Sequence, residues 1–170
     1  NPLAVVANAG ADVAICEGSS TTLTASGGTS YTWNTGATTA SITVSPSATT
    51  SYSVTVTDGM TSDTDAVEVT VNALPTANAG LDVAIIIGNS TTLTATGGGT
   101  YLWNTGETTA SITVSPASTT TYSVTVTQNG CETTDDVQVT VNPLAVVANA
   151  GADVAICEGS STILTASGGT

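Results

Sequence analysis

The sequence contains no lysine, arginine, histidine or phenylalanine, and all 13 of its formal charges are carboxylates. Cationic side chains are needed to neutralise the phosphates of a nucleic acid or the headgroups of an anionic membrane, so we expect neither as a partner. Acid–base or nucleophilic catalysis would depend on carboxylates, tyrosines and thiols alone. No run approaches the roughly 18 apolar residues of a membrane-spanning helix, so we expect no membrane insertion.

The chain is dominated by repetition. Residues 31–57 return as residues 101–127 with only five positions changed, so that Trp33 recurs as Trp103. Residues 1–29 return as residues 142–170 with a single change, so that Cys16 recurs as Cys157. Self-similarity at a fixed period indicates a tandem array. We therefore predict two complete repeats and the first two strands of a third, with the boundaries 1–71, 72–141 and 142–170.

Short runs of alternating apolar and polar residues fill each repeat. Residues 41–44, 51–57 and 65–71 alternate, and glycine, aspartate and asparagine mark turns between such runs. Residues 1–15 are expected to form a first strand that is broken at residues 8–10, where Asn-Ala-Gly interrupts the apolar run. No window has a useful helical periodicity. The pattern predicts an all-β fold of antiparallel sandwiches.

Each complete repeat has one tryptophan. Each also has a tyrosine near the start of the alternating run 51–57 or of its copy, 121–127. Buried aromatic residues at these places are expected in an immunoglobulin-like sandwich, which makes Trp33, Tyr52, Trp103 and Tyr122 the predicted core. The succession ANAGADVAI, GSSTTLTASGG, YTWNTG, ATTSYSVTVTD and VEVTVN resembles the PKD-like and immunoglobulin-like tandem repeats of large secreted surface proteins, notably adhesins of Bacteroidota. The resemblance implies head-to-tail sandwiches at the cell surface or outside the cell.

We interpret the chain as a structural segment of an extracellular fibre, stalk or giant surface adhesin that provides reach and cohesion without catalysis. Its expected partners are neighbouring repeats, identical chains in a fibre, and attached glycans. Two alternatives stay open: a module whose Thr-rich faces bind a glycan or a protein partner, and an accessory domain of a secreted hydrolase. Asp63 with Asp65, and Asp135 with Asp136, look like catalytic carboxylate pairs, but we interpret them as solvated residues at a hairpin end.

The cysteines predict how the repeats are joined. Cys16 follows the first strand, at the trailing end of its sandwich, whereas Cys131 lies in a turn at the leading end of its own sandwich. Within one sandwich these two turns are a strand length apart, about 15–20 Å, and a disulfide needs Cα atoms within about 7 Å. In a head-to-tail rod the trailing end of repeat one meets the leading end of repeat two. We therefore predict an interdomain disulfide between Cys16 and Cys131, with Cys157 unpaired; three free thiols are the alternative.

The substitutions between repeats fit this arrangement. The second repeat has Ile86 at the position of Cys16, and the first repeat has Thr61 at the position of Cys131, so disulfide joints are expected to alternate with apolar joints. Glu17 and Glu132 flank the predicted bond without any cationic neighbour, which makes them candidate ligands for a cation. Ca²⁺ is the candidate because hard cations prefer carboxylate oxygens; no other cofactor is expected.

Serine and threonine make up about a third of the chain. Hydroxyl groups hydrate the outer faces of strands without charge, and they are also acceptors for O-linked glycans. The densest run predicts glycan attachment at Ser118, Thr119, Thr120 and Thr121.

Overall fold

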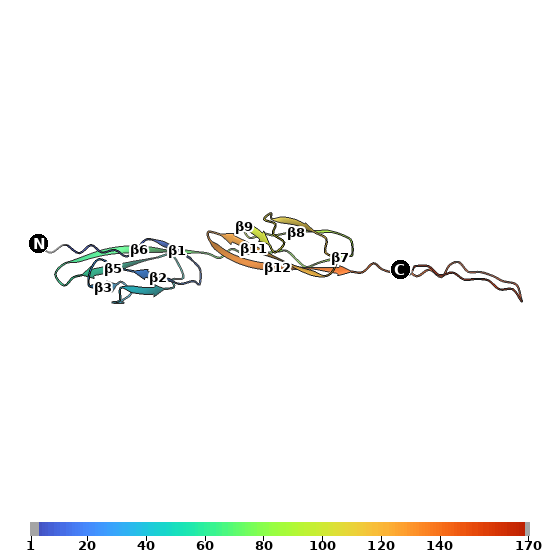
Figure 1. The fold of residues 1–170 in the computed structure, drawn as a ribbon, viewed down its shortest axis with the longest axis horizontal. Coiled ribbons are helices and arrows are strands. Elements are labelled where there is room, and N and C mark those ends of the chain that lie inside the picture. The colour runs from blue at the N-terminus through green and yellow to red at the C-terminus, as the bar shows by residue number, and fades with distance from the viewer. Residues whose placement is uncertain (1–3, 169–170) are drawn as a thin grey trace.

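The computed structural model describes residues 4–168, in which two β-sandwiches lie end to end and are followed by an extended C-terminal segment (Figure 1). Residues 1–3 and 169–170, which belong to the first and third predicted repeats, lie outside the described residues. Residues 4–168 contain strands and no helix, so none of these residues lies in a helix that could cross a membrane.

From residue 4 onward, the first sandwich has six strands in two sheets. They are β1 (Val13–Cys16), β2 (Thr21–Thr24), β3 (Ser30–Trp33), β4 (Ser41–Val44), β5 (Thr50–Thr57) and β6 (Ser62–Asn72). One sheet has the order β1-β6-β5-β3, and the other consists of β2 paired with β4. Strand β4 has the predicted bounds, whereas β6 begins at Ser62, before the predicted strand 65–71.

The second sandwich repeats this arrangement. Its strands are β7 (Val83–Ile86), β8 (Thr91–Thr94), β9 (Thr100–Trp103), β10 (Ser111–Val114), β11 (Thr120–Gln128) and β12 (Cys131–Asn142). The sheets have the orders β7-β12-β11-β9 and β10-β8. Strand order is therefore identical in the two repeats, and the prediction of tandem all-β sandwiches is confirmed.

The first strand of each sandwich changes sheet. At Asn8 the backbone forms an isolated antiparallel bridge with Ser26, which follows β2 of the two-stranded sheet, and after the break at Gly10 the chain continues as β1 beside β6. The β1–β6 pairing is parallel, with Val13 opposite Val69, and so is the β7–β12 pairing. The expectation of wholly antiparallel sheets is wrong at these two pairs, because alternation of side chains does not reveal the direction of a neighbouring strand.

Each core is built around its tryptophan. Trp33 and Trp103 are both 1% exposed, and Tyr52 and Tyr122 are buried in the same two clusters. The Trp33 indole Nε1 donates a hydrogen bond of 3.0 Å to the carbonyl oxygen of Thr39, so its one polar group is satisfied. Strands β5 and β6 supply most of the remaining fully buried side chains, at Val54, Val56, Val67 and Val69.

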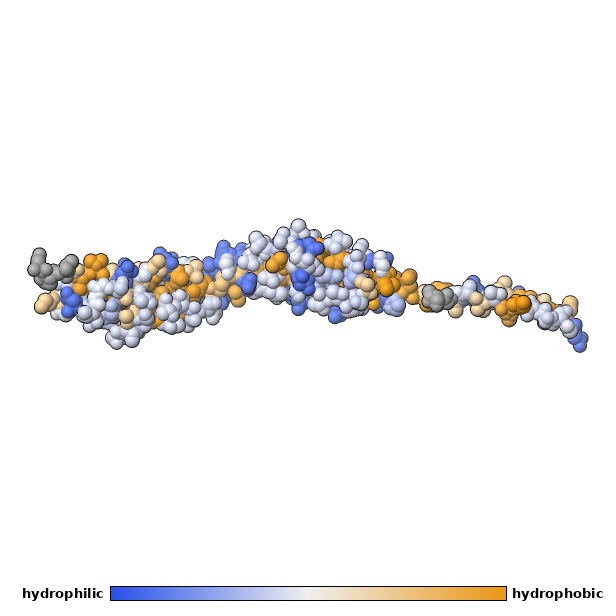
Figure 2. Space-filling view, in the orientation of Figure 1, coloured by the Kyte–Doolittle hydropathy of each residue, from blue (hydrophilic) through white to orange (hydrophobic). Residues whose placement is uncertain are grey.

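The third predicted repeat does not form its two expected strands in the structure. Residues 143–168 contain only an isolated bridge between Asn149 and Ser167. Leu164 is 72% exposed, although the equivalent Leu23 of β2 is 4% exposed. In the first sandwich the same sequence pairs with β4 and β6, and the chain of 170 residues contains no third copy of those strands. The segment therefore leaves its apolar side chains on the surface, where Figure 2 shows them.

Candidate functional site

The candidate site is the joint between the two sandwiches, where a covalent bond connects them. Cys16, the last residue of β1, forms a disulfide with Cys131, the first residue of β12, and their Cα atoms are 5.6 Å apart. The pair is the one expected from the sequence. Cys131 is 1% exposed, so the joint covers its sulfur from solvent.

A tight turn positions Cys131. Strands β11 and β12 are connected through Asn129 and Gly130, both with positive φ (50° and 78°), so that Gln128 faces Cys131 directly. Asn-Gly favours this two-residue turn because both positions need a left-handed backbone. Asn72 at the end of β6 donates its side-chain N–H to the carbonyl oxygen of Asn129 at 3.2 Å. The turn is thus held to the first sandwich by a hydrogen bond as well as by the disulfide.

The corresponding turn of the first sandwich is wider. Asp58 accepts hydrogen bonds from the backbone N–H groups of Thr61 (2.7 Å) and Met60 (2.8 Å). These donors, the Thr61 N–H first, hold the pKa of the Asp58 carboxyl below its usual range. The turn presents Met60, which is 83% exposed, at the leading end of the first sandwich. At the trailing end of the second sandwich, Ile86 and Ile87 are also exposed, and the apolar joint expected there stays a prediction.

The paired carboxylates form hydrogen bonds that their interpretation as solvated hairpin residues did not anticipate. Asp63 accepts the backbone N–H of Ala7 at 2.9 Å, and Asp65 accepts that of Ala9 at 2.9 Å. The donors lie in the first part of the first strand, before the chain crosses from the other sheet to β6. The two carboxylates therefore bridge the gap that the change of sheet opens. They are structural groups, so the description of them as merely solvated is corrected.

The second sandwich keeps part of this arrangement. Asp135 accepts the N–H of Ala79 at 2.8 Å, whereas Thr133 replaces Asp63 and accepts the N–H of Ala77 at 3.2 Å. Asp136 is exposed. Sequence reasoning missed these bonds because donor and acceptor are distant in the sequence, and only the register of the parallel pair brings them together.

Acid should weaken this attachment. The N–H groups of Ala9 and Ala66 hold the pKa of Asp65 below its usual range. Since the pKa is lowered by folding, the contribution to stability is complete above the unfolded-state value of about 3.9 and is lost as the pH falls through the lower folded-state value. We expect the thermal midpoint, followed by circular dichroism, to fall below about pH 4.

The matched variant for this effect is Asp65→Asn, whose amide oxygen still accepts a hydrogen bond but does not titrate. Other carboxylates, Asp58 among them, contribute to the pH dependence of both proteins, so the comparison depends on the difference between the two curves. The variant's midpoint should fall less steeply with acid than that of the parent. Parallel curves would contradict the assignment.

The remaining predicted sites are dispersed. Glu17 and Glu132 are exposed beside the disulfide, and no group of three or more potential metal ligands occurs among the described residues. Ca²⁺ binding there stays a prediction. Cys157 is exposed and forms no disulfide.

The predicted glycan acceptors occupy the connection before β11 and its first residues. Ser118, Thr119 and Thr121 are exposed and Thr120 is half-buried. Two of their hydroxyl groups bond to backbone: Thr119 accepts the N–H of Val141 at 3.1 Å, and Thr120 donates to the carbonyl oxygen of Ser118 at 2.7 Å. Glycan attachment stays a prediction, and Ser118 and Thr121 are its more accessible positions.

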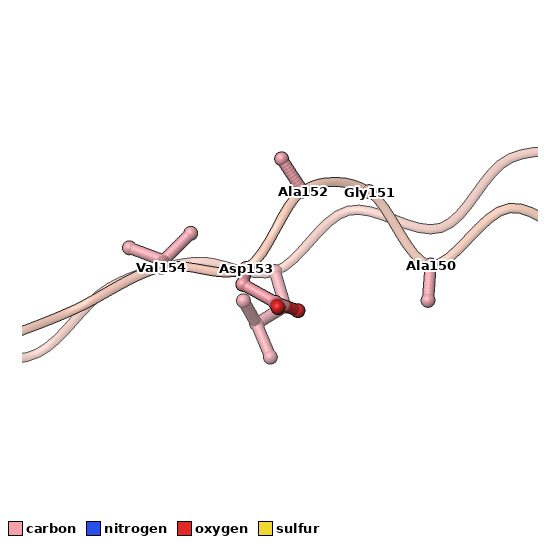
Figure 3. A pocket seen from close by; sticks show the side chains of 6 residues that line it. Ala150, Gly151, Ala152, Asp153 and Val154 are labelled. Atoms are coloured by element: carbon pink, nitrogen blue, oxygen red, sulfur yellow. The ribbon is translucent and has the colours of Figure 1, made fainter.

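One surface depression is a candidate small-molecule site. This shallow depression lies between the two legs of the C-terminal segment (Figure 3), and it is lined by Ala150, Gly151, Ala152, Asp153, Val154 and Leu164. Asp153 is the one titratable side chain in this lining. The depression therefore lacks the converging polar groups of a binding or catalytic pocket.

Strand order, the change of sheet by the first strand and the buried tryptophan together define the fold. The chain is a tandem of immunoglobulin-like sandwiches. No family model and no curated protein matches its sequence. Among solved structures the tandem is similar to extracellular domains 3–5 of Drosophila OTK, with 12% identity and a TM-score of 0.48 over 78% of this chain and 59% of that chain.

Two further solved structures have comparable similarity to the tandem. Immunoglobulin domains 1–4 of Sidekick-1 share 13% identity with a TM-score of 0.41, over 83% of this chain and 48% of that chain. The insect immune protein hemolin shares 15% identity with a TM-score of 0.41, over 79% of this chain and 46% of that chain. The tandem thus spans less than two thirds of each of these three structures, and the likeness concerns the fold alone.

Proposed function

We propose that the chain is a structural repeat segment of an extracellular fibre, stalk or giant surface adhesin. The observation that carries this proposal is the covalent joint: two near-identical sandwiches meet end to end through the Cys16–Cys131 disulfide. A flexible string of binding domains would not need a fixed joint, whereas a rod that provides reach does. Neighbouring repeats are then the principal partners, and identical chains and attached glycans are further ones.

The disulfide also supports the proposed location. Such bonds persist in oxidising compartments, so the protein would reside outside the cell or on its surface. Outside the cell, the carboxylates of Glu17 and Glu132 beside the disulfide, which have no cationic partner, would be stabilised by water or by Ca²⁺. The absence of histidine, lysine and arginine from the sequence, together with the structural use of Asp63 and Asp65, supports a role without catalysis.

Antibodies raised against the 170-residue chain test the proposal on the organism that produces it. Immunogold electron microscopy should label extended material outside intact cells, and pre-immune serum is the control. Label confined to the cell interior would contradict the proposal. Strong, saturable binding of the isolated chain to one glycan on an array would instead favour the alternative of a binding module.

A further inference from the structure

The disulfide connects two strands that each run the length of their own sandwich. The first strand runs alongside β6 over its whole length: Ala7 and Ala9 bond to the side chains of Asp63 and Asp65, and Val13–Cys16 pair with the backbone of β6 up to Asn72. Strand β12 starts at Cys131, at the joint, and ends at Asn142, at the far end of the second sandwich. Figure 1 shows β6 and β12 along the long axis of the molecule.

A direct covalent route therefore crosses both sandwiches. It runs along residues 4–16, passes through the disulfide and continues along residues 131–142. Residues 17–130, which include the peptide linker between the sandwiches, lie outside this route in a loop that the disulfide closes. Of the twelve strands in residues 4–168, ten belong to the closed loop; β1 and β12 are the other two.

We propose that this route is an inextensible strap that carries tension along the fibre and shields both sandwiches from mechanical unfolding. The proposal rests on the function proposed above and specifies how the segment resists load. Chain in a β-strand already rises about 3.3 Å per residue, close to the limit of about 3.3–3.6 Å for a fully extended chain. Tension on the strap consequently gains almost no length.

The direction of the load supports the same conclusion. Force enters the first sandwich at the start of its first strand and leaves at Cys16, the end of that strand. It enters the second sandwich at Cys131 and leaves at Asn142, the two ends of β12. Since each sandwich is pulled at the two ends of a single strand, the force does not separate paired strands from each other.

Loss of the disulfide would send the load through every residue between the two cysteines. The sequence separation is 115 residues, and at roughly 3.4 Å per residue the released length is about 390 Å. Because each sandwich has its own hydrophobic core, we expect the two to unfold separately, and this length should then appear as two steps of about 200 Å each.

The return of residues 1–29 as residues 142–170 places the two strands of the strap next to each other in the sequence. Strand β12 leads directly into residues 142–157, which repeat residues 1–16 without a change. A single continuous stretch from Cys131 to Cys157 thus contains both the strand that leaves one disulfide and a copy of the strand that enters one. In this stretch Cys157 occupies the position of Cys16.

Single-molecule force spectroscopy on the full 170-residue chain, held at its two termini, tests the proposal. The oxidised chain should show smooth stretching of the C-terminal segment and no unfolding step. After reduction of the same chain with a phosphine, two steps of about 200 Å should appear. Steps of this size in the oxidised chain, with the disulfide verified by mass, would overturn the proposal.

Variants provide a second measurement. Cys16→Ser combined with Cys131→Ser should show both steps without reductant, and the matched variant Cys157→Ser should behave like the oxidised parent. The reduced parent protects the conclusion from a folding defect in the double variant. A stepless trace from the reduced parent would also contradict the strap, whereas immunogold labelling would still test the extracellular fibre independently.

Discussion

Replacing Trp33 by alanine is expected to unfold the first sandwich under conditions in which the second stays folded. The side chain is 1% exposed and is the largest in its core. Truncating a buried tryptophan costs about 3–5 kcal/mol. A sandwich of this size has a stability of roughly 3–10 kcal/mol at the usual 0.05–0.15 kcal/mol per residue. The substitution should therefore remove a large part of the stability, or all of it.

The two tryptophans allow the sandwiches to be followed one at a time. In Trp33→Ala the remaining indole, Trp103, reports on the second sandwich alone, while circular dichroism reports on both. Denaturant titration should show an unchanged fluorescence transition and the loss of about half of the cooperative change in circular dichroism. Trp103→Ala is the matched control and should give the converse result. If either variant destabilised both sandwiches equally, the two sandwiches would unfold as one cooperative unit, which would contradict the prediction.

Replacing Gly27 by alanine is the second large effect that we expect. Gly27 has a φ of 110°, and a Cβ atom there would overlap the carbonyl oxygen of Val6 in the first strand. Left-handed backbone costs a non-glycine residue about 1–2 kcal/mol, and forcing an extra carbon into a packed site costs a further 1–3 kcal/mol or so. The variant should lose both amounts, because the first strand cannot approach the turn as closely.

Gly36→Ala separates the two contributions. Gly36 also has a positive φ, 88°, but a Cβ atom there would meet nothing within 4 Å. Its loss of stability should be limited to the backbone term of about 1–2 kcal/mol. Urea denaturation followed by tryptophan fluorescence measures both variants, because the transition of the unchanged second sandwich, reported by Trp103, should stay constant. Equal losses at the two positions would show that the close approach to Val6 contributes nothing.

The sequence predicted strands best where side-chain alternation is strict and every paired neighbour is antiparallel. The run 41–44 became β4 without adjustment, and 51–57 became β5 with one added residue. The sequence predicted β6 less well: Asp63 lies before the predicted strand 65–71 but pairs with β5, and both Asp63 and Asp65 bond to the first strand. Polar residues inside a strand can be interpreted only once their partners are known.

The joint was open to prediction for a different reason. Its geometry follows from where two turns lie in a sandwich and from the substitution of Ile86 and Thr61 at the equivalent positions, all of which the repeat makes visible. The register that aligns Ala7 with Asp63 leaves no such trace, because it depends on how closely β1 packs against β6. The third predicted repeat failed to form strands for a related reason: residues 143–168 carry the correct pattern, but a strand also requires a neighbour.

The separation of Cys16 and Cys131 by 115 residues also sets an order of events during synthesis. At about 5–20 residues per second, Cys131 emerges roughly 6–23 s after Cys16. This interval is long enough for the first sandwich to fold and to hold the Cys16 thiol at its trailing end. Cys157 follows Cys131 after a much shorter stretch of chain. If the first sandwich folds during synthesis, it has therefore already placed Cys16 at its trailing end when Cys131 arrives.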